Sequence, residues 1–210
     1  MLARFSPYWL WILLAVPAFF IVHDAVTSTN PRIFHILVHP SGETSARLLI
    51  VAMLAPLLSL LFKGHRGPRW LLRNRRYFGV AAFAYAALHT MFYVLDKSSL
   101  DRIVGDLERL YIWTGWLAFA IFIPLAATSM DYALRKLGRR WKTLQRWVYA
   151  AAVLSLVHWA SLHQWDEVVP ALLHFTPLIA LSIYRIGHMH GRSGNLRQAP
   201  TAPADEGAKG

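Results

Sequence analysis

Long apolar runs, separated by short polar and charged clusters, dominate the hydropathy pattern of this chain. The runs cover roughly residues 8–26, 46–62, 77–95, 111–130, 147–164 and 168–186. Each approaches the ~20 residues that an α-helix needs to cross the hydrocarbon core of a bilayer. The pattern therefore predicts an all-α integral membrane bundle of six transmembrane helices, with a tight hairpin between the last two.

Proline occurs inside four of the runs, at Pro17, Pro56, Pro124 and Pro177. Such prolines would argue against soluble helices, but membrane helices tolerate them where neighbouring groups satisfy the freed backbone. We expect kinks at these positions.

The composition supports a membrane protein. Of 210 residues, 56% are hydrophobic and 16% charged, which is unusual for a soluble domain. The net charge of +11 comes from basic residues between the apolar runs, not along one face, so it indicates membrane topology and not nucleic-acid binding. Segments 63–76 and 135–146 carry six Lys or Arg residues each. The positive-inside rule places these segments, and both termini, in the cytoplasm.

The two ends of the chain are expected to differ. The first apolar run follows Arg4 like a signal peptide, but it is long and lacks an A-x-A cleavage site, so we interpret it as a membrane anchor. Residues 187–210 are small, polar and rich in Pro and Gly. This composition predicts a disordered cytoplasmic tail.

Several classes of chemistry have no support in the sequence. Cysteine is absent, which excludes disulfides, thiolate nucleophiles and Cys-ligated metals. There is no G-x-G-x-x-G or P-loop motif, so we expect no dinucleotide-binding domain in this sequence. The ten histidines remain as the main candidate ligands.

Two histidines reach the same depth of the predicted bundle. His89 follows Arg76 by about 20 Å of helix, and His158 follows Arg146 by about 18 Å, on spans that run in the same direction. Two neutral imidazoles at equal depth suit bis-histidine haem ligation. His174 reaches almost the same depth and His163 lies nearer the outer edge, so depth alone does not select two ligands. Buried histidines that bond across helices are the alternative interpretation.

The basic segments also admit two interpretations. They set topology and attract anionic lipid, or they hold an anionic cofactor such as a flavin phosphate on the cytoplasmic side.

Four stretches resemble a known family. They are HPSGETSARLLIVAMLAPLL at 39–58, RRYFGVAAFAYAALHTMFYVL at 75–95, WTGWLAFAIFIPLAATS at 113–129 and RKLGRRWKTLQRWVYAAAVLSLVHW at 135–159. The chain is similar there to the MsrQ (YedZ) family, the haem-binding membrane subunits of bacterial protein-methionine-sulfoxide reductase systems. These subunits have ferric-reductase-like transmembrane domains.

The resemblance implies cofactors and their ligands. It selects His89 and His158 as the axial ligands of one haem b and demotes His174. It also implies bound FMN, for which the candidate residues are Thr128, Ser129, Arg75, Arg76, Arg139 and Arg140. Gln145 stands where the family often has a histidine, so a second haem is not expected.

The function that the resemblance implies is electron transfer across the bacterial inner membrane. Electrons from a cytoplasmic flavin reductase or quinone would reach a periplasmic molybdenum-containing methionine sulfoxide reductase, MsrP. Substrate chemistry would then occur on the partner. Two alternatives remain: a stand-alone haem-containing ferric or quinone-linked reductase, and a small histidine-dependent transporter.

Overall fold

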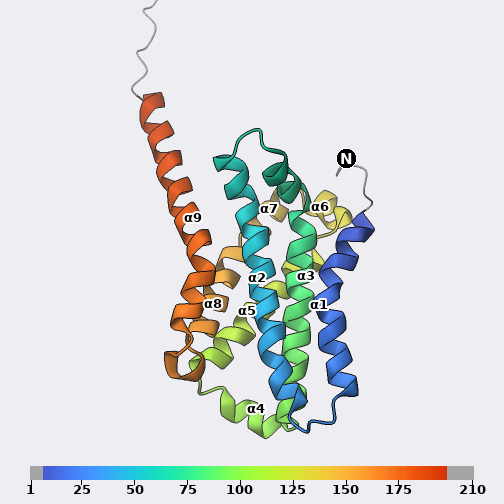
Figure 1. The fold of residues 1–210 in the computed structure, drawn as a ribbon. Helices are drawn as coiled ribbons and strands as arrows, with labels where there is room; N and C mark the ends of the chain where they lie inside the picture. The colour runs from blue at the N-terminus through green and yellow to red at the C-terminus, as the bar shows by residue number, and fades with distance from the viewer. Residues whose placement is uncertain (1–6, 198–210) are drawn as a thin grey trace, which may run out of the picture.

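The computed structural model describes residues 7–197, without the side chains of residues 7, 163, 164, 186 and 188–197. Its described residues form α-helices and one short 3-10 segment, with no strand among them (Figure 1). The elements are α1 (Pro7–Thr27), α2 (Ile33–Leu61), α3 (Arg66–Lys97), α4 (Leu100–Asp106), α5 (Leu110–Ala127), α6 (Asp131–Leu137), α7 (Arg139–Gln145), α8 (Val148–Ala160), η2 (Leu162–Trp165) and α9 (Val168–Arg197).

Five of the described helices are long and apolar enough to cross a membrane. They are α1, α2, α3, α5 and the Val168–Arg185 part of α9. The all-α membrane fold is therefore confirmed. The fifth predicted span, residues 147–164, contains the 13-residue helix α8, which is about 20 Å long. Since this is shorter than a hydrocarbon core of about 30 Å, six spans with cytoplasmic termini stay a prediction.

Two helices begin well before the predicted spans. α2 begins at Ile33 and not near residue 46, and α3 begins at Arg66 and not near residue 77. Hydropathy does not join these turns to the predicted spans, because residues 39–45, which are rich in Pro, Gly and polar side chains, interrupt the apolar start of α2, and arginines interrupt the start of α3. In α2, for example, the Thr44 hydroxyl donates to the Pro40 carbonyl at 2.7 Å, so this polar side chain has its hydrogen-bond partner on its own helix. The basic segments 63–76 and 135–146 are accordingly mostly helical, in α3, α6 and α7.

The predicted disordered tail also needs correction. α9 continues to Arg197, so residues 187–197 are helical, and residues 198–210 lie outside the described part of the chain. Both described ends, at α1 and α9, lie at the same end of the bundle, and α4 lies at the opposite end (Figure 1).

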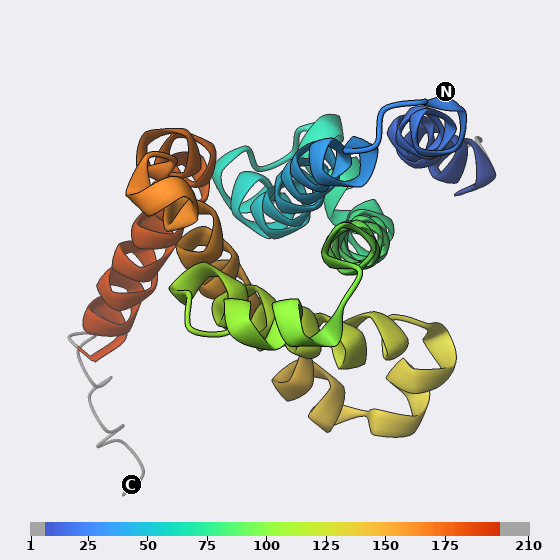
Figure 2. The same ribbon diagram turned by 90° about the horizontal axis from the view of Figure 1, so that it is seen from below.

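Two closely packed helix pairs form the centre of the bundle. α2 packs along α3, and α5 packs along α8. α9 contacts α2 and α8, and α1 lies on the other side against α2 and α3 (Figure 2). The largest buried cluster joins both pairs, with Leu49, Ala82, Phe122 and Ala151 among its members. The pairs thereby form a four-helix frame around the site described below.

The Tyr85 side chain of α3 forms hydrogen bonds with the backbone of α1 next to Pro17. Its buried hydroxyl donates to the Leu14 carbonyl and accepts from the Ala18 N–H, both at 2.8 Å. A proline in a helix removes a backbone donor and pushes the preceding turn open, and a polar side chain inserted there satisfies the freed groups. This contact fixes the position of α1 on α3.

Candidate functional site

A cavity of about 310 Å³ lies between α2, α3, α5 and α8. Its walls are mainly apolar, and a polar end reaches His35, Asp96 and Lys97, near α4. Its volume is at the lower end of the range for cofactor pockets.

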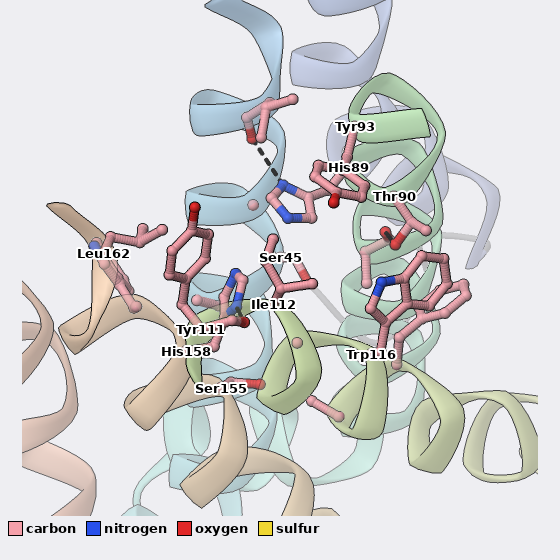
Figure 3. Close-up of a pocket in the computed structure, with 18 of the residues that line it drawn as sticks. Ser45, His89, Thr90, Tyr93, Tyr111, Ile112, Trp116, Ser155, His158 and Leu162 are labelled. Carbon is pink, nitrogen blue, oxygen red and sulfur yellow. Dashed lines mark hydrogen bonds between the residues drawn. The ribbon is translucent and has the colours of Figure 1, made fainter. Parts of the chain in front are cut away.

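His89 of α3 and His158 of α8 both line this cavity (Figure 3). Their ring centroids are 5.9 Å apart and their planes are perpendicular. Two imidazole nitrogens that bind one metal ion from opposite sides, each at about 2 Å, lie about 4 Å apart. The ring separation is compatible with one ion between the two side chains.

Each imidazole has one nitrogen committed to the backbone of a neighbouring helix. Nδ1 of His89 lies 2.8 Å from the Val38 carbonyl of α2, and Nδ1 of His158 lies 2.5 Å from the Tyr111 carbonyl of α5. A carbonyl oxygen can only accept, so Nδ1 carries the proton in both rings. Nε2 is then the unprotonated nitrogen, which is the form that binds metals.

The donor set fits a haem better than a bare metal ion. Among the described residues, no cluster of three or more His, Cys, Asp or Glu side chains could hold a metal. A haem supplies its own equatorial nitrogens and takes only axial ligands from the protein. Two imidazoles at an apolar cavity therefore match its requirements.

His174 of α9 has a different environment. Its Nδ1 donates to the Pro170 carbonyl of its own helix at 2.8 Å, and its Nε2 lies 3.4 Å from Arg47 Nε. Its ring packs on Trp159 at a centroid distance of 4.9 Å. His174 is absent from the cavity lining. The His163 side chain lies outside the described part of the structure.

The residues predicted to bind flavin divide into two groups. Arg76, Thr128 and Ser129 come together: the Arg76 guanidinium donates to the Ser129 carbonyl at 2.7 Å and to Asp131 at 2.6 Å. The Arg76 hydrogen bond lowers the pKa of Asp131. Arg75, Arg139 and Arg140 are exposed.

Both hydroxyls of this first group bond to their own helix. Thr128 Oγ1 donates to the Pro124 carbonyl and Ser129 Oγ to the Leu125 carbonyl, each at 2.6 Å. A hydroxyl oxygen has two acceptor sites; Thr128 Oγ1 uses one for Gln145 Nε2, at 3.2 Å, and can accept one more hydrogen bond.

Gln145 has a structural role that the sequence did not reveal. Its Nε2 donates to the Leu125 carbonyl at 3.1 Å and to Thr128 Oγ1 at 3.2 Å. Trp141 Nε1 adds a bond to the Thr128 carbonyl at 2.9 Å. α7 thereby caps the C-terminal end of α5. The position that could have carried a second haem ligand holds two helices together.

An ionic cluster at the α4 end of the cavity was also missed. Lys97 Nζ lies 2.6 Å from Asp106, and the Tyr93 hydroxyl donates to Asp106 at 3.1 Å. The Lys97 hydrogen bond lowers the pKa of Asp106. Lys97 and Asp106 are charged and lie near the ends of the segment that joins α3 to α5. A search for apolar periodicity therefore does not detect them.

Comparison with known proteins gives two findings. Residues 41–156 match the family described as ferric reductase like transmembrane component. The chain is also similar to proteins named protein-methionine-sulfoxide reductase heme-binding subunit MsrQ. The relative from Bordetella pertussis is 37% identical over 177 residues, 81% of this chain and 82% of the relative. The relative from Ralstonia nicotianae is 37% identical over 171 residues, 75% of each chain.

Proposed function

The chain belongs to the MsrQ family of ferric-reductase-like membrane proteins, and from this premise we propose that it is the haem-binding electron-transfer subunit of a methionine sulfoxide reductase system. The observation that carries the proposal is the pair of imidazoles at one apolar cavity, each with Nδ1 bonded to a neighbouring helix. Family membership suggests the reductase system, and the geometry of the two imidazoles suggests which residues would bind the haem.

In this proposal, Nε2 of His89 and Nε2 of His158 would be the two protein ligands of the iron of a single haem b. The haem would supply one-electron chemistry inside the membrane. The protein side of the mechanism is orientation: the Val38 and Tyr111 carbonyls hold both rings in the Nδ1–H tautomer, which also raises the basicity of Nε2. The cavity walls are mainly apolar, so burial and ligand basicity would together tune the potential of the haem.

We further propose that electrons enter at the basic end of the bundle, from a cytoplasmic flavin reductase or a quinone. FMN is the proposed second carrier there. The exposed Arg75, Arg139 and Arg140 offer cationic groups for its phosphate, and the hydroxyl oxygens of Thr128 and Ser129 offer hydrogen-bond acceptors.

The proposed acceptor is the periplasmic catalytic subunit MsrP, and the proposed location is the bacterial inner membrane. The cavity extends to His35, Asp96 and Lys97 at the end opposite the basic helices α6 and α7. That position would bring the haem close to the surface from which a periplasmic partner takes electrons.

The family description supports one alternative, a stand-alone ferric reductase. The two functions differ in the terminal acceptor and not in the haem site. Reduction of a ferric chelate at undiminished rate without the periplasmic subunit, with no reduction of that subunit, would favour the alternative.

The test is the visible spectrum and the haem content of the purified protein. We expect about one six-coordinate haem b per chain. His89→Ala and His158→Ala should each abolish the low-spin spectrum, because one imidazole cannot hold both axial positions. His23→Ala, on exposed α1, is the matched control and should leave the spectrum unchanged. Full haem retention in both ligand variants would refute the assignment.

A further inference from the structure

Each of the two carbonyls that accept a hydrogen bond from an imidazole is followed, four residues later on the same helix, by a glycine. Val38 precedes Gly42 in α2, and Tyr111 precedes Gly115 in α5. Side chains on a helix lean toward its N-terminus, so the residue at i+4 covers the carbonyl of residue i. At both carbonyls that covering residue is glycine and has no side chain.

The space left by each glycine is filled by the histidine ring. A Cβ added at Gly42 would lie 2.7 Å from Nδ1 and 2.9 Å from Cε1 of His89. A Cβ added at Gly115 would lie 2.7 Å from Nδ1 and 2.8 Å from Cε1 of His158. These distances are far inside van der Waals contact, and both rings are already held by the backbone.

Among the glycines whose surroundings the structure describes, only these two positions meet a histidine ring. A Cβ added at Gly67, Gly79, Gly105 or Gly187 would meet nothing within 4 Å. Gly79 lies on α3, the same helix as His89, and so provides a control for the general effect of replacing a helical glycine.

We propose that Gly42 and Gly115 are positioning residues for the two histidines. Each glycine uncovers the carbonyl four residues before it, so that an imidazole from the paired helix can donate Nδ1–H to that oxygen. The bond fixes the tautomer and turns Nε2 toward the cavity. The same device occurs once in the α2 and α3 pair and once in the α5 and α8 pair, so each helix pair sets one ligand. This inference rests on the proposed haem function.

The first experiment compares Gly42→Ala, Gly115→Ala and Gly79→Ala in the purified holoprotein. The readouts are haem per chain and the amplitude of the low-spin ferric signal in electron paramagnetic resonance. We expect at least a threefold loss of low-spin haem in the first two variants, since the methyl group displaces the ring from its carbonyl. Gly79→Ala should match the unsubstituted protein. Low-spin haem at the unsubstituted level in both Gly42→Ala and Gly115→Ala would overturn the inference.

A second experiment separates the contact from a general folding defect. Gly42→Ala is combined with His89→Ala and, separately, with His158→Ala, and Tm is measured in detergent. If the glycine serves His89, Gly42→Ala lowers Tm in the His158→Ala background but not in the His89→Ala background. Equal losses in the two backgrounds would show that Gly42 serves helix packing, and would overturn the inference.

The two backgrounds also distinguish this inference from the proposed function. Absence of haem from the unsubstituted protein would refute the function. Neither histidine variant would then differ in haem content, and the comparison of Tm would still test the glycine contact. Haem in the unsubstituted protein with unaltered glycine variants would refute the positioning role alone.

Discussion

The three histidines at similar depth differ in what their two nitrogens contact. In His89 and His158, Nδ1 donates to another helix and Nε2 remains for a ligand at the cavity. In His174, Nδ1 donates within its own helix and Nε2 faces Arg47. A guanidinium is a permanent cation, so it opposes metal binding at that nitrogen. The partners of the two nitrogens therefore distinguish the two proposed ligands from His174, which depth does not.

We predict that His174→Ala retains haem. The substitution removes a ring that packs on Trp159, but it leaves both proposed ligands and their carbonyl partners in place. Haem per chain and the low-spin spectrum should equal those of the unsubstituted protein, while His158→Ala, on the adjacent helix, loses both. Loss of the low-spin spectrum in His174→Ala would reassign a ligand.

Helix α1 depends on α3 for its backbone bonding. We predict that Tyr85→Phe lowers the free energy of unfolding by about 1–3 kcal/mol, because it leaves the Leu14 carbonyl and the Ala18 N–H without their shared partner. Tyr77→Phe is the control, since Tyr77 lies on the same helix and contacts Trp11 of α1 through its ring. Thermal unfolding in detergent measures both. Equal Tm values for the two variants would contradict the role of the Tyr85 hydroxyl.

The junction of α3 and α4 should weaken in acid. The Lys97 hydrogen bond lowers the pKa of Asp106, so its stabilising effect is full above the unfolded-state pKa of about 3.9. It is lost as the pH falls below 3.9 and through the lower folded-state value. We predict that Asp106→Asn costs about 1.5–3 kcal/mol at neutral pH and that this cost shrinks in acid.

Tm measured between pH 3 and 7 tests this dependence. Asp101→Asn, an exposed acidic position of the same helix, should show no such loss at neutral pH. A difference between Asp106→Asn and the unsubstituted protein that stays constant down to pH 3 would contradict the assignment of the effect to this carboxylate.

Sequence reasoning worked where it needed only the distance of a residue from the charged boundary of its own helix. Equal distances from charged boundaries brought His89 and His158 to one depth, and the structure places them at one cavity. It failed at helix ends, because polar, Pro and Gly residues at 39–45 interrupt the apolar start of α2 and arginines interrupt that of α3, and hydropathy reports apolar length and not backbone conformation. It also missed the partners of Nδ1 and the bonds of Gln145, which depend on packing between distant helices.

The whole molecule has one strongly basic end and one end with the ionic cluster of α4. Both described chain ends lie at the basic end, where α6 and α7 also lie (Figure 1). The positive-inside rule predicts that this is the cytoplasmic end. The cavity reaches the other end, so the proposed single haem there would leave the inner half of the membrane to another carrier, which is the physical argument for proposing FMN at the basic end.

The number of spans decides whether this arrangement is correct, and it depends on α8. If α8 crosses, the α8–α9 turn faces the periplasm together with α4; if it does not, that turn lies on the side of α7.

The chain has no cysteine, so single introduced cysteines report accessibility without background labelling. Asp101→Cys, Thr143→Cys and Asp166→Cys place one thiol at each exposed site. We predict that a membrane-impermeant maleimide labels Asp101→Cys and Asp166→Cys in spheroplasts, and Thr143→Cys only after lysis. Labelling of Asp166→Cys only after lysis would mean that α8 does not cross, and with the ends of the chain then on opposite sides the six-span fold would be wrong.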